Sequence, residues 1–135
     1  MKGIELVLNI ETLEIAKAYL FGGVKYLDLL LLLSFIDVFT GVVKAVKDKT
    51  LRSRNAWFGY VRKFMSFVVV ILANIIDQIC NLNGVLVFGT VLFYIANEGL
   101  SIIENLAQMG VKVPGFIKDK LQVIEEDSQK EKSAE

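Results

Sequence analysis

Three long apolar stretches constrain this chain more than any other feature of its sequence. They are YLDLLLLLSFIDVFTGVVKAV at residues 26–46, FMSFVVVILANIIDQIC at 64–80 and VLVFGTVLFYIANEGLSII at 85–103. Charged residues cluster between and after these stretches, in two blocks at 52–63 and 118–135. A helix needs about 20 predominantly apolar residues to cross the hydrocarbon core of a bilayer. The sequence therefore predicts a membrane protein.

A soluble helical bundle is the alternative fold. Hydrophobic residues make up 54% of the 135 residues, against roughly 45–50% in soluble domains. Runs such as LLLLLSFI and VVVILANII leave almost no polar face, whereas a helix at a water-facing surface has one. We therefore expect an all-α membrane protein with three transmembrane helices, plus amphipathic N-terminal and C-terminal helices.

The chain divides into three expected parts. Residues 1–24 form an amphipathic N-terminal segment that ends at a double glycine, with a mobile leader as the alternative. Residues 25–110 form the membrane domain, and residues 111–135 form a cytoplasmic amphipathic helix with a charged tail. The expected spans are about 26–46, 58–80 and 85–105, and the expected turn before the last part contains Gly110 and Pro114.

The N-terminal segment is not expected to be a cleaved signal peptide. Its glutamates distinguish it from a cleaved signal peptide, which has a basic start and an uncharged apolar centre. If the segment inserted, the chain would have four spans and the N-terminus would move to the cytoplasm.

The connection between the first two spans is strongly basic. Its cations are Lys47, Lys49, Arg52, Arg54, Arg62 and Lys63. Basic connections stay in the cytoplasm, so we expect the N-terminus outside and the C-terminus in the cytoplasm. A nucleic-acid patch is the competing interpretation, but the net charge is zero and we expect no nucleic acid partner.

Several classes of function are excluded by residues that the sequence lacks. It has no His and only one Cys, which rules out a disulfide framework, Cys/His zinc sites and hydrolases with a histidine base. Carboxylates could serve acid/base chemistry, but no nucleophile or metal constellation accompanies them. We expect no enzyme, no catalytic residue, no metal and no cofactor.

The predicted spans contain polar residues at helical spacing. The candidate residues for an oligomer interface or pore face are Ser34, Asp37, Gly41, Lys44, Asp77, Asn97, Glu98, Ser101, Glu104 and Asn105. An aspartate at a helix centre opposes insertion by about 2.5–3.5 kcal/mol, so such groups must be neutralised, paired or turned toward a protected interior. Lys44 is a candidate partner for one of the carboxylates.

Two interpretations of these polar residues remain open. Asp37 and Asp77 could tie the three helices of one subunit together. Alternatively, the polar stripes could line subunit interfaces or a water-filled lesion in an oligomer, and the Gly41/Ala45 pair would permit close helix approach.

Three blocks of sequence carry a family resemblance. They are DVFTGVVKAVKDKTLRS at 37–53, WFGYVRKF at 57–64 and YIANEGLSIIENLAQMGVKVP at 94–114. Together they resemble the toxin-secretion/phage-lysis holin family, whose members combine an Asp-x-x-Thr-Gly segment with a Glu-x-Leu-Ser-Ile-x-Glu-Asn signature before a Gly-Val-x-Val-Pro turn. The resemblance covers residues 37–121.

The resemblance implies a holin. Such a protein oligomerises with copies of itself in the lipid bilayer of the bacterial cytoplasmic membrane and permeabilises it, so that a cell-wall hydrolase or a large toxin is released. The residues alone leave two alternatives. One is a small ion channel or proton-coupled transporter with a titratable pathway through Asp37, Asp77 and Glu98. The other is an antiholin or regulatory membrane subunit.

Overall fold

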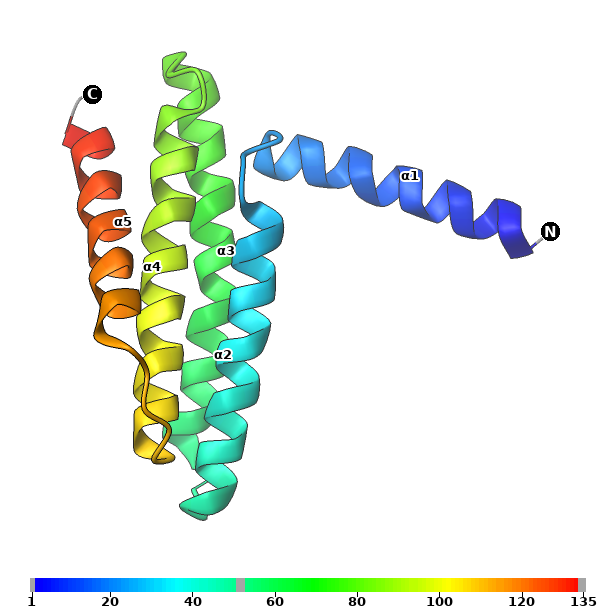
Figure 1. The fold of residues 1–135 in the computed structure, drawn as a ribbon. Helices are drawn as coiled ribbons and strands as arrows, with labels where there is room; N and C mark the ends of the chain where they lie inside the picture. Colours follow the sequence, from blue (N-terminus) through cyan, green and yellow to red (C-terminus); the bar gives the residue numbers. More distant parts are fainter. Residues whose placement is uncertain (1, 51–52, 134–135) are drawn as a thin grey trace.

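The computed structural model describes residues 2–50 and 53–133, and in this part of the chain it contains five helices and no strand (Figure 1). The helices are α1 Lys2–Phe21, α2 Leu27–Lys47, α3 Arg54–Cys80, α4 Val85–Gln108 and α5 Gly115–Ser133. The predicted all-α fold class is confirmed.

Helices α2, α3 and α4 form the body of the molecule. The chain runs along α2, returns along α3 and runs forward again along α4, so that α2 and α4 are parallel (Figure 1). With 21, 27 and 24 residues and about 1.5 Å of rise per residue, each helix can cross a hydrocarbon core of about 30 Å. Within the described residues, these are the helices that are long and apolar enough to do so.

Helix α3 begins earlier than the sequence predicts. Its first residue is Arg54, because the preceding Ser53 caps the helix by accepting a hydrogen bond from the backbone N–H of Ala56 at 3.1 Å. Much of the predicted basic connection is therefore helical, and its Lys63 becomes the tenth residue of α3.

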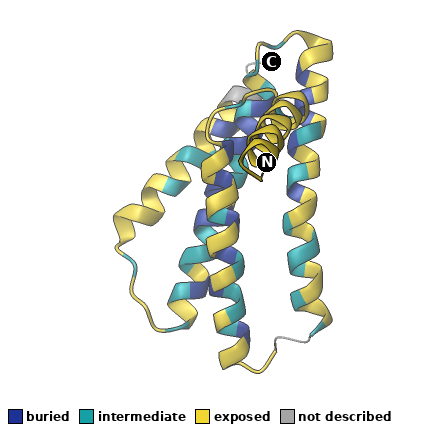
Figure 2. Ribbon diagram, turned by 90° about the vertical axis from the view of Figure 1, so that its right-hand side faces the viewer, coloured by how far each residue is buried: buried dark blue, intermediate teal, exposed yellow. Residues whose placement is uncertain are grey.

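The apolar core lies where α2, α3 and α4 meet, and its fully buried members are Leu30, Val70 and Val91. Large apolar side chains also cover the outer faces, where Leu31, Phe35 and others are exposed (Figure 2). An apolar exterior around a small core is typical of helices that face lipid.

Helix α1 extends sideways from the body of the molecule, and almost all of its residues are exposed (Figures 1 and 2). The expected helix forms, but its charges do not lie on one face. Glu5 and Glu14 are nine residues apart, which is about two and a half turns, so they lie on opposite sides. The amphipathic pattern expected for this segment is thus weak.

Helix α5 packs against α4, a contact that the sequence did not predict. After a turn in which Gly110 has φ of 83°, the chain reverses and α5 runs back along α4 (Figure 1). The helix also continues through most of the predicted charged tail, to Ser133.

Candidate functional site

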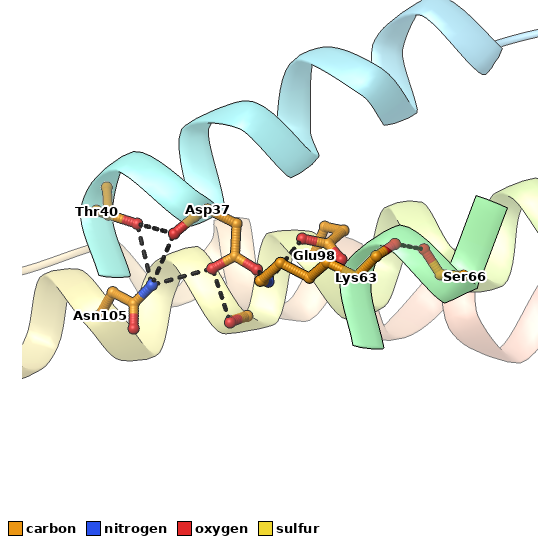
Figure 3. Close-up of polar contacts among 7 residues, drawn as sticks. Asp37, Thr40, Lys63, Ser66, Glu98 and Asn105 are labelled. Atoms are coloured by element: carbon orange, nitrogen blue, oxygen red, sulfur yellow. Dashed lines mark hydrogen bonds and ion pairs between the residues drawn. The ribbon is translucent and has the colours of Figure 1, made fainter. Parts of the chain in front are cut away.

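Asp37 is the centre of a polar network between the three long helices (Figure 3). It is the eleventh of the 21 residues of α2, and only 1% of its surface is exposed. Its Oδ1 accepts hydrogen bonds from Ser101 Oγ at 2.8 Å and from Asn105 Nδ2 at 3.0 Å. Its Oδ2 is bound by the ammonium group of Lys63. A buried carboxylate needs this set of partners, because an unpaired charge is costly inside a protein.

Lys63 joins Asp37 to a second carboxylate. Its Nζ lies 3.2 Å from Oε2 of Glu98, whose side chain is 4% exposed, whereas the side chain of Lys63 is 23% exposed. One ammonium therefore serves two buried carboxylates, contributed by α2 and α4. Removing one partner of a buried ion pair costs about 3–5 kcal/mol, because the other charge is left uncompensated.

The amide of Asn105 adds a second link between α2 and α4. Besides Asp37 Oδ1, its Nδ2 contacts Oγ1 of Thr40 at 3.0 Å (Figure 3). A Cβ atom on Gly41 would lie 3.7 Å from the same Nδ2, which is ordinary contact. Thr40 was not among the candidate residues predicted from sequence, although its position three residues after Asp37 places it on the same face.

The cation of this network is not the one expected from sequence. Lys44 forms no ion pair with any described residue, and Lys63, which was expected in the cytoplasmic loop, takes that role. The reason is geometric. Lys44 lies two turns along α2 from Asp37, about 10 Å away along the axis, whereas the antiparallel α3 brings Lys63 level with Asp37.

Asp77 lies apart from the network, at the turn between α3 and α4. It is 4% exposed, and its two oxygens accept hydrogen bonds from the backbone N–H groups of Gly84 at 2.7 Å and Val87 at 3.1 Å. The carboxylate thus satisfies free N–H groups at the start of α4, as an N-cap does. Asp77 was predicted to act with the other intramembrane carboxylates, but its hydrogen bonds are made at the α3–α4 turn, away from Asp37 and Glu98.

The remaining candidate residues are distributed around the network. Ser34 is buried, and its Oγ has no hydrogen-bond partner among the described residues. Asn97 and Glu104 are exposed, and Glu104 accepts a hydrogen bond from Gln108. Of the cations in the basic connection, Lys47, Lys49, Arg54 and Arg62 are exposed, while Arg52 lies outside the described residues. Gly110 and Pro114 lie in the turn between α4 and α5.

Two open grooves flank the network. A groove of about 720 Å³ between α3 and α4 is lined by Lys63, Glu98 and Ser101, among others. A second groove of about 480 Å³ is lined by residues of α2, α3 and α4 that include Asp37 and Lys63. Helix α3 packs mainly on α4 and contacts α2 little. The buried charges are therefore adjacent to space that water could enter.

A family profile and a named relative indicate the same family. The profile of the "Bacteriophage holin family" matches residues 16–126. The "Probable holin" of Bacillus phage phi105 is 69% identical over 121 residues, which cover 90% of each chain. "Uncharacterized protein YqxH" of Bacillus subtilis (strain 168) is 67% identical over 133 residues, 98% of this chain and 95% of the relative. A Clostridium perfringens protein, "Uncharacterized 14.9 kDa protein in nagH 3'region", is 40% identical over 97 residues, 70% of this chain and 73% of the relative. No solved structure matches.

Proposed function

Because this chain belongs to the bacteriophage holin family, we propose that it oligomerises in the bacterial cytoplasmic membrane and permeabilises it to release a cell-wall hydrolase or a large toxin. The family and the three apolar helices support the cytoplasmic membrane as its location. The cargo and the oligomer are parts of the proposal.

The observation that carries this proposal is the Asp37–Lys63–Glu98 network. In one protomer, its charges are satisfied inside a bundle whose outer faces are apolar and suit lipid. If α3 moves away from α2 and α4, the same three charges can be hydrated through the flanking grooves. Hydration offsets the lost packing, so the chain has a lipid-compatible closed form and a water-compatible open form.

Assembly would make the opening steeply dependent on concentration. Hydrogen bonds between transmembrane helices contribute about 0.6–2 kcal/mol each. Exposed polar residues such as Asn97 and Glu104 lie on α4 where a neighbouring copy could contact them. Many such hydrogen bonds, each of modest free energy, would form together when many copies assemble. The membrane would then open late and suddenly.

The distribution of cations supports one orientation in the membrane. Lys47, Lys49 and Arg54 lie at the connection between α2 and α3, whereas the turn between α3 and α4 reads Asn-Leu-Asn-Gly. By the positive-inside rule, we propose that the first connection is cytoplasmic, with the N-terminus outside and the C-terminus inside.

A titratable pathway through Asp37, Asp77 and Glu98 receives less support. Asp77 accepts two backbone hydrogen bonds at the opposite end of α3 from the network. Its carboxylate is engaged in holding the α3–α4 turn, so the three residues do not form one cluster.

The proposal is tested with the purified protein in liposomes that contain a small dye and a large labelled dextran. We expect both markers to escape above a threshold protein concentration. Release from a single purified component would exclude a purely regulatory subunit. Escape of ions or dye with complete retention of the dextran would count against a holin and favour a selective channel.

A further inference from the structure

Helix α5 is docked on α4 through one side. Leu121, Ile124 and Glu125 are half-buried and Ser128 is fully buried, and their spacing places them on one face of the helix. Leu121 lies directly over Gly99, because a Cβ atom on Gly99 would approach the Leu121 Cδ2 to 2.7 Å. The contact therefore depends on a glycine in α4.

The α4 face under α5 points away from the other two spans. Ala96 precedes Asn105 by nine residues, about two and a half turns, so it lies on the side of α4 opposite to the polar network. Ala96 is nevertheless fully buried, and Gly89 and Gly99 are buried as well. Small residues on one helix allow the backbone of another helix to come close.

The outer side of α5 is incompatible with lipid. Its exposed charged residues include Lys118, Asp119, Lys120, Glu126 and Asp127. Since Gly99 is the fifteenth of the 24 residues of α4, a docked α5 would lie at the depth of the hydrocarbon core when α4 spans the membrane. Charges at that depth strongly oppose insertion. Helix α5 therefore cannot remain docked on α4 when lipid surrounds α4.

We propose that α5 is a removable cover, and that the α4 face of Ala96 and Gly99 binds the same face of a second copy once α5 has left. The inference rests on the proposed function, for which it names the assembly surface. A second copy fits better than lipid chains, because the structure already seats a helix on this face in close contact. The segment 109–114, with Gly110 at φ of 83°, supplies the hinge.

The first test uses cysteine cross-linking of the full-length chain in bacterial membranes. The exposed Cys80 is replaced by Ser, and Ala96→Cys is introduced because it adds only a thiol at the covered face. We expect oxidation to give a disulfide-linked dimer. The matched control is Leu72→Cys, which is 54% exposed on α3 and should give little dimer. No dimer through position 96, or equal dimer from both variants, would overturn the proposal.

The second test weakens the cover without altering α4. Leu121→Ala removes the contact with Gly99, and Val123→Ala removes an apolar side chain of α5 that is 48% exposed. In the Ala96→Cys background, we expect Leu121→Ala to raise the dimer yield at limiting protein roughly tenfold, corresponding to a lost docking contact, and Val123→Ala to leave it unchanged. An unchanged or lower dimer yield with Leu121→Ala would mean that α5 does not cover the assembly surface, and would reject the proposal.

Marker release by the wild-type chain is measured in parallel. Release without cross-linking through position 96 refutes the assembly surface alone. Cross-linking without release supports this surface and refutes the proposed permeabilisation.

Discussion

Lys63 compensates more buried charge than any other described side chain of this chain. Its ammonium contacts Asp37 from α2 and Glu98 from α4, and its own backbone belongs to α3, so one side chain connects three helices. The two carboxylates differ in their other support. Asp37 also accepts hydrogen bonds from Ser101 and Asn105, so it retains polar partners if Lys63 is lost.

We predict that Lys63→Met destabilises the folded protein by about 3–5 kcal/mol, because two buried carboxylates lose their cation. Thermal or chemical unfolding in detergent, followed by circular dichroism, measures the change. Lys47→Met is the control, since Lys47 is exposed at the end of α2 and forms no ion pair among the described residues. Equal stability of the two variants would contradict the assigned role of Lys63.

Asp77 allows a second prediction at this scale. Asp77→Ala removes the acceptor for the N–H groups of Gly84 and Val87, and should cost about 0.5–2 kcal/mol, as the loss of an N-cap does. Asp77→Asn keeps one acceptor oxygen and should cost less. Neither variant should abolish marker release, which separates this structural role from a proton pathway. Loss of release in a folded Asp77→Asn protein would instead support the pathway.

Among the elements, the apolar helices were the most predictable, because long runs of Leu, Ile and Val leave few alternatives to a membrane span. The start of α3 was less predictable, since it depends on the cap formed by Ser53. The polar face of α4 was visible in the spacing of Glu98, Ser101 and Asn105. Its cation was not, because the pairing of Lys63 with Asp37 depends on the register between two antiparallel helices. Docking of α5 on α4 could not be predicted either, since it depends on contact between residues that are far apart in sequence.

The junction of α1 with α3 provides a test at the scale of elements. Asn74 donates hydrogen bonds to the carbonyl oxygens of Tyr19 at 3.5 Å and Leu20 at 3.0 Å, and a Cβ on Gly22 would lie 2.4 Å from Asn74 Oδ1. We predict that Gly22→Ala detaches α1 from α3 and makes the segment before residue 27 several times more sensitive to protease.

Gly23→Ala is a matched control for that experiment. Gly22 and Gly23 have nearly the same φ, 68° and 66°, so alanine is strained similarly at both positions. Only Gly22 faces Asn74, whereas a Cβ on Gly23 would meet nothing within 4 Å. If both variants are cleaved at the same rate, backbone strain accounts for the effect and the Asn74 contact does not fix α1.

The whole molecule has an apolar exterior that suits lipid and a charged network in its interior. Under the proposed mechanism, this network is needed for membrane permeabilisation but not for the stability of the fold. Well-packed apolar residues can replace a buried ion network with little loss of stability, or with a gain. We therefore predict that the triple variant Asp37→Leu, Lys63→Met, Glu98→Leu remains folded in the membrane with a Tm no lower than the wild type. It should release neither dye nor dextran from liposomes, because the charges of the network, which water would hydrate in the open form, have been removed.

The control for the triple variant is an ion pair outside the network. Lys17 and Asp28 are 2.6 Å apart, and their side chains are 46% and 83% exposed, so they are already hydrated. Replacing them with Met and Leu should leave release unchanged, because hydration of this pair does not differ between a closed and an open form. Wild-type release by the apolar triple variant would show that the lesion forms without the network. The opening would then have to be driven by contacts between protomers alone.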